Sequence, residues 1–293
     1  MSQLPYVIVD VFTLTPGGGN PLAVVFDAEG EDDLTLQRIA REFNFSETTF
    51  VLPPTSAGHD YRVRIFTPTR EVPFAGHPNI GTACVLAERG LVESGRLSFE
   101  ELAGTVDIEV TTAPDLWAKL LAPGALTQGV PVSTSAVARA LGLSDADIEL
   151  SVHAPLEASV GLPFTMVQLK SQDALDRAEV NVSALKAAHA DGINPDIHCY
   201  VRDGQNIEAR MFAPMDGVIE DPATGSANCA LVALLTALHN ADDARLDWQV
   251  SQGVAMGRPS VLTLTTEKRG GEVRRVWLAG HSRIFAEGTL RTG

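Results

Sequence analysis

Apolar and polar residues are distributed along this chain in two patterns that predict two kinds of helix. Residues 36–43 carry apolar side chains at helical spacing after Asp32 and Asp33, acids suited to a helix N-terminus. Residues 182–190 follow Asn181 with a similar spacing. Both segments are predicted to be amphipathic helices that bury one face.

The second kind of helix is apolar on nearly every side. It is predicted over residues 80–87, before Glu88-Arg89-Gly90, and over residues 227–238, before His239-Asn240. A helix of this kind must be surrounded by protein. The flanking segments have the pattern of short strands, namely residues 96–99, 105–110, 260–265 and 273–278. The pattern therefore predicts strands wrapped around a central helix, once in each half of the chain.

The two halves also share motifs in the same order, which indicates an internal duplication. The spacing between matching motifs drifts by only a few residues, as small loop insertions would produce. Coincidental Pro and Gly punctuation between unrelated strands accounts poorly for three ordered matches. The matched pairs are residues 19–25 (GNPLAVV) with 161–167 (GLPFTMV), 64–68 (RIFTP) with 210–214 (RMFAP), and 73–77 (PFAGH) with 222–226 (PATGS).

A chain of 293 residues is longer than one hydrophobic core usually supports, so we expect two domains. We place them at residues 1–122 and 130–293, with the last strand a candidate for packing on the N-terminal domain. Residues 121–131, punctuated by Pro and Gly, are the predicted linker. The expected fold class is α+β, with two pseudo-symmetric domains that each curl a sheet around a central α-helix.

A formal net charge of −15 disfavours binding to nucleic acid or to anionic lipid head groups, and no Lys or Arg cluster offsets it. The first residues lack a basic signal region, and no apolar run is long enough to span a bilayer. We therefore expect a cytoplasmic protein without nucleic-acid or membrane partners. Cys84, Cys199 and Cys229 show neither disulfide nor zinc spacing, so we expect buried free thiols and no metal.

The candidate chemistry lies where the two apolar helices begin. Each follows a glycine, Gly76 or Gly225, that lets another group approach the backbone closely. The N–H groups and partial positive charge of a helix N-terminus suit a carboxylate. If the two halves face each other, both N-termini converge on one ligand. We therefore expect a small-molecule carboxylate in a cleft lined by Gly76 and Gly225.

Side chains capable of acid–base chemistry stand near these glycines: His77, Asp221 and Ser226, with Glu220 beside Asp221. Glu47 precedes an apolar strand, where partial burial would raise its pKa toward the range useful for proton transfer. Structural roles compete with these functions. Glu47 and Asp221 also suit turns or caps, His77 a local hydrogen bond, and Ser226 an N-cap. Taken singly, these residues leave both interpretations open.

In combination, the motifs resemble those of the PhzF family of phenazine-biosynthesis-like proteins. The resemblance runs from residue 10 to residue 260 in the family's order, and it is specific. The motifs that carry it are residues 10–12 (DVF), 18–25 (GGNPLAVV), 46–51 (SETTFV), 64–68 (RIFTP), 73–78 (PFAGHP), 220–227 (EDPATGSA), 252–253 (QG) and 257–260 (GRPS).

The resemblance implies the diaminopimelate epimerase-like fold, with the active site in a cleft between two similar domains. In the family, a glutamate shuttles a proton during isomerisation of trans-2,3-dihydro-3-hydroxyanthranilate, and Glu47 is the matching residue. The histidine, aspartate and serine that hold the substrate match His77, Asp221 and Ser226. The resemblance also implies that no metal or organic cofactor takes part and that the protein forms a homodimer.

The sequence departs from the other branch of this fold at two positions. Diaminopimelate epimerases and proline racemases place a cysteine before each helix glycine, whereas this chain has Ala75 and Thr224. Two-thiol racemisation thereby loses both acid–base groups, and Glu47 has no obvious twin in the second half. The alternatives left open are a non-catalytic protein that binds small carboxylates, and a dehydratase or epimerase. Arg258 is a candidate substrate contact, with support of a strand as its ordinary alternative.

Overall fold

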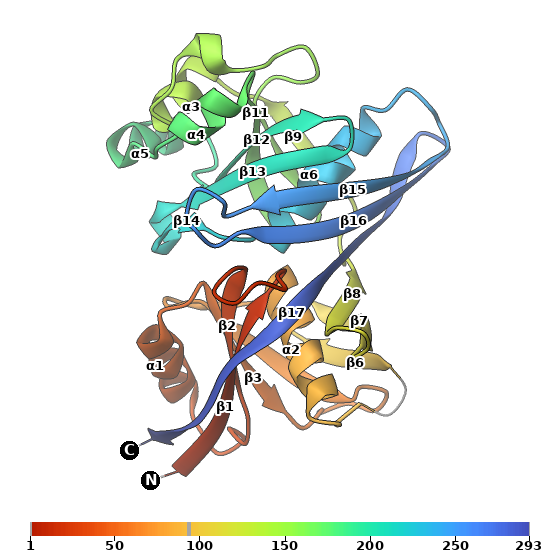
Figure 1. Ribbon diagram of the computed structural model, residues 1–293. Helices are drawn as coiled ribbons and strands as arrows, with labels where there is room; N and C mark the ends of the chain where they lie inside the picture. The colour runs from red at the N-terminus through yellow and green to blue at the C-terminus, as the bar shows by residue number, and fades with distance from the viewer. Residues whose placement is uncertain (1, 93–94, 293) are drawn as a thin grey trace. The chain divides into compact units, whose positions relative to one another are not determined.

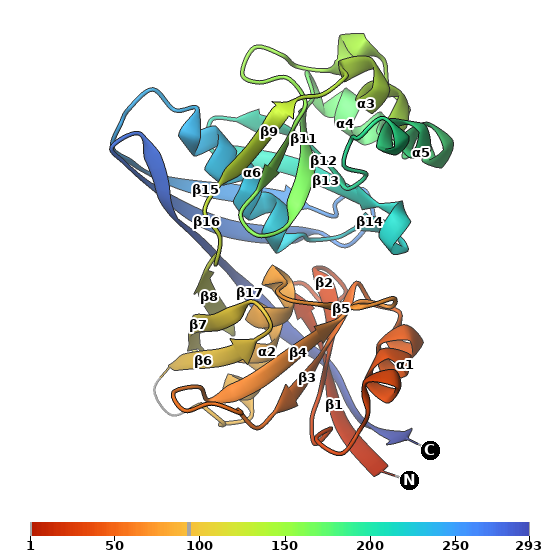
Figure 2. The same ribbon diagram turned by 180° about the vertical axis from the view of Figure 1, so that it is seen from behind.

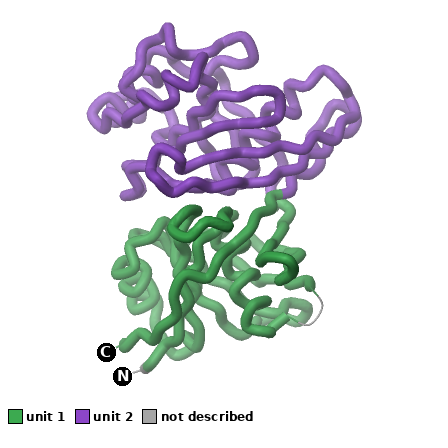
Figure 3. Tube along the Cα trace, in the orientation of Figure 1, with its two compact units in different colours: residues 1–123, 278–293 green, residues 124–277 purple. Residues whose placement is uncertain are grey.

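The computed structural model describes residues 2–92 and 95–292, and it divides into two compact units (Figure 3). Unit 1 comprises Met1–Pro123 and Leu278–Gly293. Unit 2 comprises Gly124–Trp277. The first half of the chain thus forms one unit together with the last residues of the second half.

Strand β17 (Glu272–Thr292) belongs to both units (Figure 1). From Ser282 onward it pairs antiparallel with β1 (Ser2–Val11) in unit 1, with Val7 opposite Glu287. The sequence analysis expects this last strand to be a candidate for packing on the N-terminal domain. The division therefore falls within a single strand at the C-terminal side, although the sequence assigns residues 130–293 to one domain.

The strands of unit 1 form a closed barrel. In its described residues, eight strands pair edge to edge in the order β17, β1, β2, β3, β4, β6, β7, β8 and back to β17. The pairs β2–β3 and β4–β6 are parallel, because α1 or α2 provides the crossover that a parallel connection needs. The elements of unit 1 besides β1 and β17 are β2 (Asn20–Val25), α1 (Asp33–Phe43), β3 (Glu47–Leu52), β4 (Tyr61–Phe66), β5 (Glu71–Val72), α2 (Gly76–Glu88), β6 (Arg96–Glu101), β7 (Gly104–Thr111) and β8 (Trp117–Leu121).

Unit 2 repeats this order of pairing. Strands β9 to β13, then β15 and β16, pair in sequence, and the parallel pairs are again the two that contain a helical crossover, β11–β12 and β13–β15. The predicted duplication is therefore confirmed in three dimensions. The elements are β9 (Thr127–Pro131), α3 (Thr134–Ala140), η1 (Asp145–Asp147), β10 (Leu156–Ser159), β11 (Pro163–Gln168), α4 (Gln172–Arg177), α5 (Val182–Ala190), β12 (Ile197–Asp203), β13 (Asn206–Ala213), η2 (Pro214–Asp216), β14 (Val218–Asp221), α6 (Gly225–Ala237), β15 (Ala244–Gln252) and β16 (Ser260–Arg269).

The two apolar helices are the central helices of their units. Helices α2 and α6 are buried over almost their whole length, and each lies within the strands of its own unit (Figure 2). The packing around α2 is close enough to select glycine at one position. A Cβ on Gly81 would approach side-chain carbons of Leu22 and Val11 to 2.7 Å, so only a residue without a side chain lets α2 approach β1 and β2 so closely.

The amphipathic helices begin where the sequence predicts. Asp32 caps α1 by accepting a hydrogen bond from Thr35 N at 2.8 Å, and Asn181 caps α5 by accepting one from Ala184 N at 3.0 Å. Each cap satisfies a backbone N–H group that has no partner within its helix. The local sequence signal and the tertiary fold therefore agree at these helix N-termini.

The predicted linker is partly wrong. Residues 121–131 include β9, which pairs antiparallel with β10. All five residues of β9 are exposed, so the strand carries no apolar alternation from which it could be recognised. Among the helices of the described ranges, none is both long and apolar enough to cross a membrane.

Candidate active site

The structure brings together two of the predicted site residues in unit 1. Glu47 is the first residue of β3, and His77 is the second residue of α2. The Oε2 atom of Glu47 lies 3.4 Å from Nδ1 of His77. The His77 side chain is 3% exposed and that of Glu47 is 19% exposed. A partly accessible carboxylate therefore rests against a buried imidazole at the N-terminus of the central helix.

The imidazole of His77 is neutral in this environment. Burial lowers the pKa of His77 to about 3, because the charged form would lose its hydration. The 3.4 Å contact with Glu47 is consequently not an ion pair at neutral pH. Nδ1 of a neutral imidazole can donate to an ionised carboxylate or accept from a protonated carboxyl group, depending on its tautomer.

Asn20 is a further member of this group that the sequence does not single out. Its Nδ2 lies 3.4 Å from Nδ1 of His77, and the residue is fully buried at the start of β2. The loop that leads to it is tightly constrained. Phe12 and Gly19 both have φ of 67°, and a Cβ on Gly19 would approach the carbonyl oxygen of Val11 to 2.4 Å. The glycine before Asn20 is therefore required by the turn. The motif at residues 18–25 contains both residues, which is the signal that could have identified Asn20.

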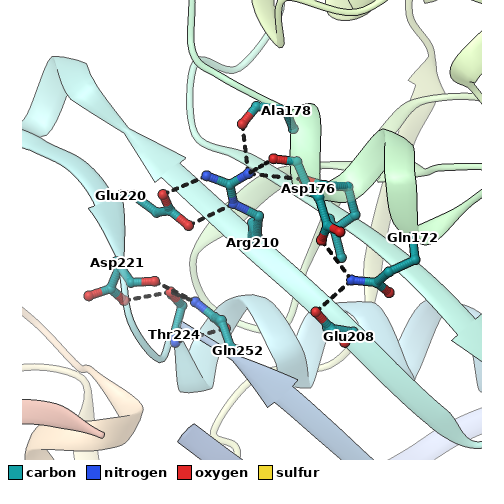
Figure 4. Close-up of polar contacts among 10 residues, drawn as sticks. Gln172, Asp176, Ala178, Glu208, Arg210, Glu220, Asp221, Thr224 and Gln252 are labelled. Carbon is teal, nitrogen blue, oxygen red and sulfur yellow. Dashed lines mark hydrogen bonds and ion pairs between the residues drawn. The ribbon is translucent and has the colours of Figure 1, made fainter. Parts of the chain in front are cut away.

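In unit 2, Asp221 and the N-terminus of α6 form one hydrogen-bonded group (Figure 4). Thr224, the N-cap of α6, donates from its Oγ1 to Oδ2 of Asp221 at 2.5 Å. Gln252, the last residue of β15, donates from Nε2 to the Asp221 carbonyl at 2.8 Å and to Oγ1 of Thr224 at 3.0 Å. Its Oε1 accepts from Thr224 N at 3.2 Å. Asp221 is thus held in place by side chains from two elements.

The network continues to a buried strand of unit 2. Asn228 donates from Nδ2 to Oε1 of Gln252 at 2.8 Å and to the Thr224 carbonyl at 3.0 Å. Oδ1 of Asn228 lies 3.1 Å from Nε2 of His198, a fully buried residue of β12. Burial lowers the pKa of His198 to about 4, so it is neutral and serves as a hydrogen-bonding group within the network.

The remaining predicted residues lie on the same first turns. Gly76 and Gly225 are the first residues of α2 and α6, and Ser226 is the half-buried second residue of α6. Neither N-cap residue, Ala75 or Thr224, uses its side chain to cap its helix. The first-turn N–H groups at both positions therefore suit an anionic ligand.

Glu220, which the sequence places beside Asp221, has a structural role. Its carboxylate forms a bidentate pair with Arg210, whose Nε and Nη2 lie at 2.8 and 2.9 Å from the two oxygens. The guanidinium also donates to three backbone carbonyls near the end of α4. In unit 1, Arg64 forms the same bidentate pair with Glu71, at 2.8 and 2.7 Å. Each pair joins two adjacent strands, and the repeat explains both.

Arg258 lies in the loop that follows Gln252. Its backbone N–H donates to the carbonyl of Gly253 at 3.0 Å, and a Cβ on Gly253 would approach the Pro222 carbonyl to 2.6 Å. The loop is therefore packed against the segment that leads into α6. Ser260 donates to the same Pro222 carbonyl at 2.9 Å. The motif at residues 252–260 thus supports the α6 N-terminus.

The cysteines lie away from both helix N-termini. Cys84, Cys199 and Cys229 are free and buried, as the sequence predicts. Burial raises the pKa of each thiol to about 12, so none is a thiolate at neutral pH. In the part of the chain that the structure describes, no group of three or more His, Cys, Asp or Glu side chains is placed to hold a metal ion.

Strand register identifies a counterpart of Glu47 that the sequence does not reveal. Leu22 on β2 pairs with Glu47, while Thr165 on β11 pairs with Ile197, the residue after Asp196. Thr165 N donates to the carbonyl of Asp196 at 2.8 Å. The repeat matches Leu22 with Phe164, the residue before Thr165, so Asp196, the residue before Ile197, stands at the register position of Glu47. Both residues are half-buried.

Comparison with solved structures defines the class of fold. A PhzF-family phenazine biosynthesis protein from Bacillus anthracis superposes with a TM-score of 0.89 at 28% identity, covering 100% of both chains. A hydroxyproline epimerase from Agrobacterium vitis, solved with bound trans-4-hydroxy-L-proline, gives a TM-score of 0.69 at 12% identity, covering 99% of this chain and 91% of that chain. The predicted α+β, diaminopimelate epimerase-like fold is therefore confirmed.

Sequence comparison then gives the family. The profile of the family described as phenazine biosynthesis-like protein matches residues 9–288. A trans-2,3-dihydro-3-hydroxyanthranilate isomerase from Pseudomonas fluorescens is 38% identical over 292 residues, covering 97% of this chain and 98% of that protein. The chain belongs to the family of phenazine biosynthesis-like proteins. It is an enzyme of the isomerase class.

Proposed function

We propose that this isomerase moves a proton between two carbons of a small amino or hydroxy carboxylate, with Glu47 as the single base. The Glu47 carboxylate removes a proton from an activated carbon, and the C–H electron pair enters the neighbouring π-system. The protonated Glu47 then returns the proton to another carbon of the same system. The reaction is redox-neutral and consumes no second substrate. General acid–base assistance of this kind contributes a factor of about 10²–10⁴ in rate.

The observation that carries this proposal is the contact between Glu47 and His77. A base that alternates between carboxylate and carboxylic acid needs a neighbour that tolerates both forms. The neutral imidazole, 3.4 Å from the carboxylate, can donate to one form and accept from the other. A positively charged neighbour would instead favour the ionised form and weaken the base.

The N-termini of the two central helices would bind the substrate. Backbone N–H groups near Gly76 and Gly225 suit its carboxylate, and the helix dipoles favour negative charge there. Asp221, fixed by Thr224 and Gln252, would accept a hydrogen bond from an amino or hydroxyl group. Ser226 would complete the set of polar contacts.

The choice of an isomerase over a two-thiol epimerase rests on Ala75 and Thr224. These residues precede Gly76 and Gly225, and neither carries a thiol. The hydroxyl of Thr224 is already engaged with the Asp221 carboxylate. A hydroxyl is also a far weaker acid than a thiol, so it would not replace a cysteine in this role.

The substrate that we propose resembles trans-2,3-dihydro-3-hydroxyanthranilate, the compound in the name of the Pseudomonas fluorescens relative. It carries a carboxylate, an amino group and a hydroxyl group, which match the helix N-termini and Asp221. We propose further that the enzyme works without a metal or an organic cofactor, as a cytoplasmic homodimer, and without nucleic-acid partners. A net charge of −15 supports the last point.

The test is proton exchange in deuterated water with this dihydro-hydroxyanthranilate. We expect the native enzyme to incorporate solvent deuterium at carbon and the Glu47→Gln variant to be about 10²–10⁴ times slower. Glu42→Gln, on the exposed face of α1, is the matched control and should match the native rate. Binding without exchange by the native protein would favour a non-catalytic carboxylate-binding protein. Undiminished turnover by Glu47→Gln would refute the assignment of the base.

A further inference from the structure

A second carboxyl group in unit 1 lies beneath the N-terminus of α2 and has no part in the reaction described above. Glu101 is the last residue of β6 and follows Leu97 and Phe99 on the buried face of that strand. The residue is 8% exposed. Its neighbour Glu100 is on the opposite face, where the Glu100 carboxylate accepts hydrogen bonds from Thr55.

Strand register makes Glu101 the counterpart of Gln252. In unit 1, Arg62 on β4 pairs with Glu100, and in unit 2, Glu208 on β13 pairs with Ser251. Arg62 and Glu208 occupy matching positions, two residues before the Arg64 and Arg210 of the repeated motif. The residues that follow, Glu101 and Gln252, each end the buried face of the strand beside the central helix.

The central helices α2 and α6 also carry matching residues, an asparagine in the first turn of each. Asn79 donates from Nδ2 to the Ala75 carbonyl at 3.1 Å, and Asn228 donates to the Thr224 carbonyl at 3.0 Å. In unit 2, Oε1 of Gln252 binds both Asn228 and the backbone N–H of Thr224. The strand residue and the helix asparagine thus hold the α6 N-terminus together.

Unit 1 has the same geometry but the wrong balance of donors and acceptors for an ionised glutamate. Both carboxylate oxygens of Glu101 and Oδ1 of Asn79 are buried, and none has a hydrogen-bond partner among the described residues. All three atoms are acceptors when Glu101 is ionised. Leaving buried acceptors unsatisfied is costly, and a buried negative charge is costlier. One added proton converts an acceptor into the missing donor.

We propose that Glu101 is a positioning residue whose carboxyl group carries a proton at neutral pH and donates it to Oδ1 of Asn79. The protonated Glu101 then ties the first turn of α2 to β6, as Gln252 ties that of α6 to β15, although Gln252 accepts from its asparagine whereas Glu101 donates to Asn79. Because His77 lies on this turn, two residues before Asn79, the proton on Glu101 keeps the imidazole aligned with Glu47. This consequence for catalysis rests on the proposed function of Glu47 and His77.

Electrostatics supports the protonated form. Burial raises the pKa of Glu101 to about 8, and the nearby Asn79 side chain is the only influence that opposes this rise. No charged side chain contributes to this shift. On α2, the neighbouring titratable group is His77, which is neutral. On β6, the Glu100 carboxylate faces outward, and its bonds to Thr55 lower its pKa to about 2. Unit 1 therefore isolates one carboxyl group that titrates near physiological pH.

The variant that separates this role from simple packing is Glu101→Gln. The side chain of glutamine has N–H donors at every pH, and glutamine is the residue at the matching position of unit 2. We expect proton exchange by the native enzyme to fall up to about tenfold between pH 8 and pH 9, as the donor is lost. Glu101→Gln should retain the activity of the native enzyme at pH 7 and remove this alkaline decline. Glu100→Gln is the matched control, and it should keep the decline.

A measurement that does not depend on enzyme activity tests the protonation of Glu101 separately from the proposed function. Carbon NMR of the glutamate-labelled native protein should show one carboxyl group, absent from the Glu101→Gln spectrum, that titrates near pH 8. Titration of that group near pH 4 would overturn the proposal, as would an alkaline decline that persists in Glu101→Gln. If the titration is as expected but Glu47→Gln remains fully active, the proposed function fails while the protonated Glu101 stands.

Discussion

The hydroxyl of Thr224 offers a direct measure of how firmly Asp221 is held. Thr224→Val replaces the hydroxyl by a methyl group of similar size, so the shape of the site is kept. The bond from Oγ1 to the Asp221 carboxylate, 2.5 Å long, is lost. Gln252 loses its 3.0 Å bond to Oγ1 but keeps its 2.8 Å bond to the Asp221 carbonyl, so one of its two amide N–H groups loses its partner. Two buried hydrogen bonds are therefore lost, and the larger cost is that of the bond to the Asp221 carboxylate.

A bond of this type contributes about 1.5–3 kcal/mol to the free energy of unfolding. For a unit of this size, a loss of about 2 kcal/mol lowers the unfolding temperature by about 4–8 °C. Thr224→Ser keeps the hydroxyl and loses one methyl group, at a cost of about 1 kcal/mol. Urea unfolding gives the free energies, and hydrogen exchange of the α6 amides reports on unit 2 specifically. If Thr224→Val were as stable as Thr224→Ser, the Asp221 contact would contribute nothing, and the argument would be wrong.

Two further predictions concern the groups around the proposed base. Because the pKa of His77 is about 3 when folded and about 6.5 when unfolded, the unfolded chain binds the proton first as the pH falls. The free energy of unfolding should therefore decrease by up to about 1.4 kcal/mol per pH unit from pH 6.5 down to about 3, and pH-dependent urea unfolding of His77→Gln should show a shallower decrease. Asp196→Asn should change the deuterium-exchange rate less than threefold if Glu47 acts alone, whereas a loss as large as that of Glu47→Gln would show a two-base reaction.

Local signals along the sequence predicted much of the fold. Asp32 and Asn181 mark the beginnings of two helices because a capping side chain acts within three residues of its own position. The central helices were recognisable because burial on every side removes polar residues from the whole segment. Strand β9 was not predicted, because its residues are exposed and burial does not select apolar residues there.

The candidate site was predictable only in part. The repeated motifs pointed to His77 and to Asp221, which directly precedes one of them, and the apolar strand that follows Glu47 pointed to that residue. Their partners lie far along the chain, as Gln252 does from Asp221, and such contacts depend on strand register. The neutral state of His77 is likewise a property of its surroundings, since every neighbour that excludes water contributes to it.

The sequence by itself determined the duplication, the two central helices and the absence of thiols before Gly76 and Gly225. Each of these features can be recognised from short segments of consecutive residues. Only the tertiary structure decided that Glu101 matches Gln252 and that Asp196 matches Glu47. Strand pairing sets these equivalences, and none of the four residues lies in a repeated motif. A side chain's protonation state and hydrogen bonds depend on what surrounds it in space, and the folded barrel alone supplies those surroundings.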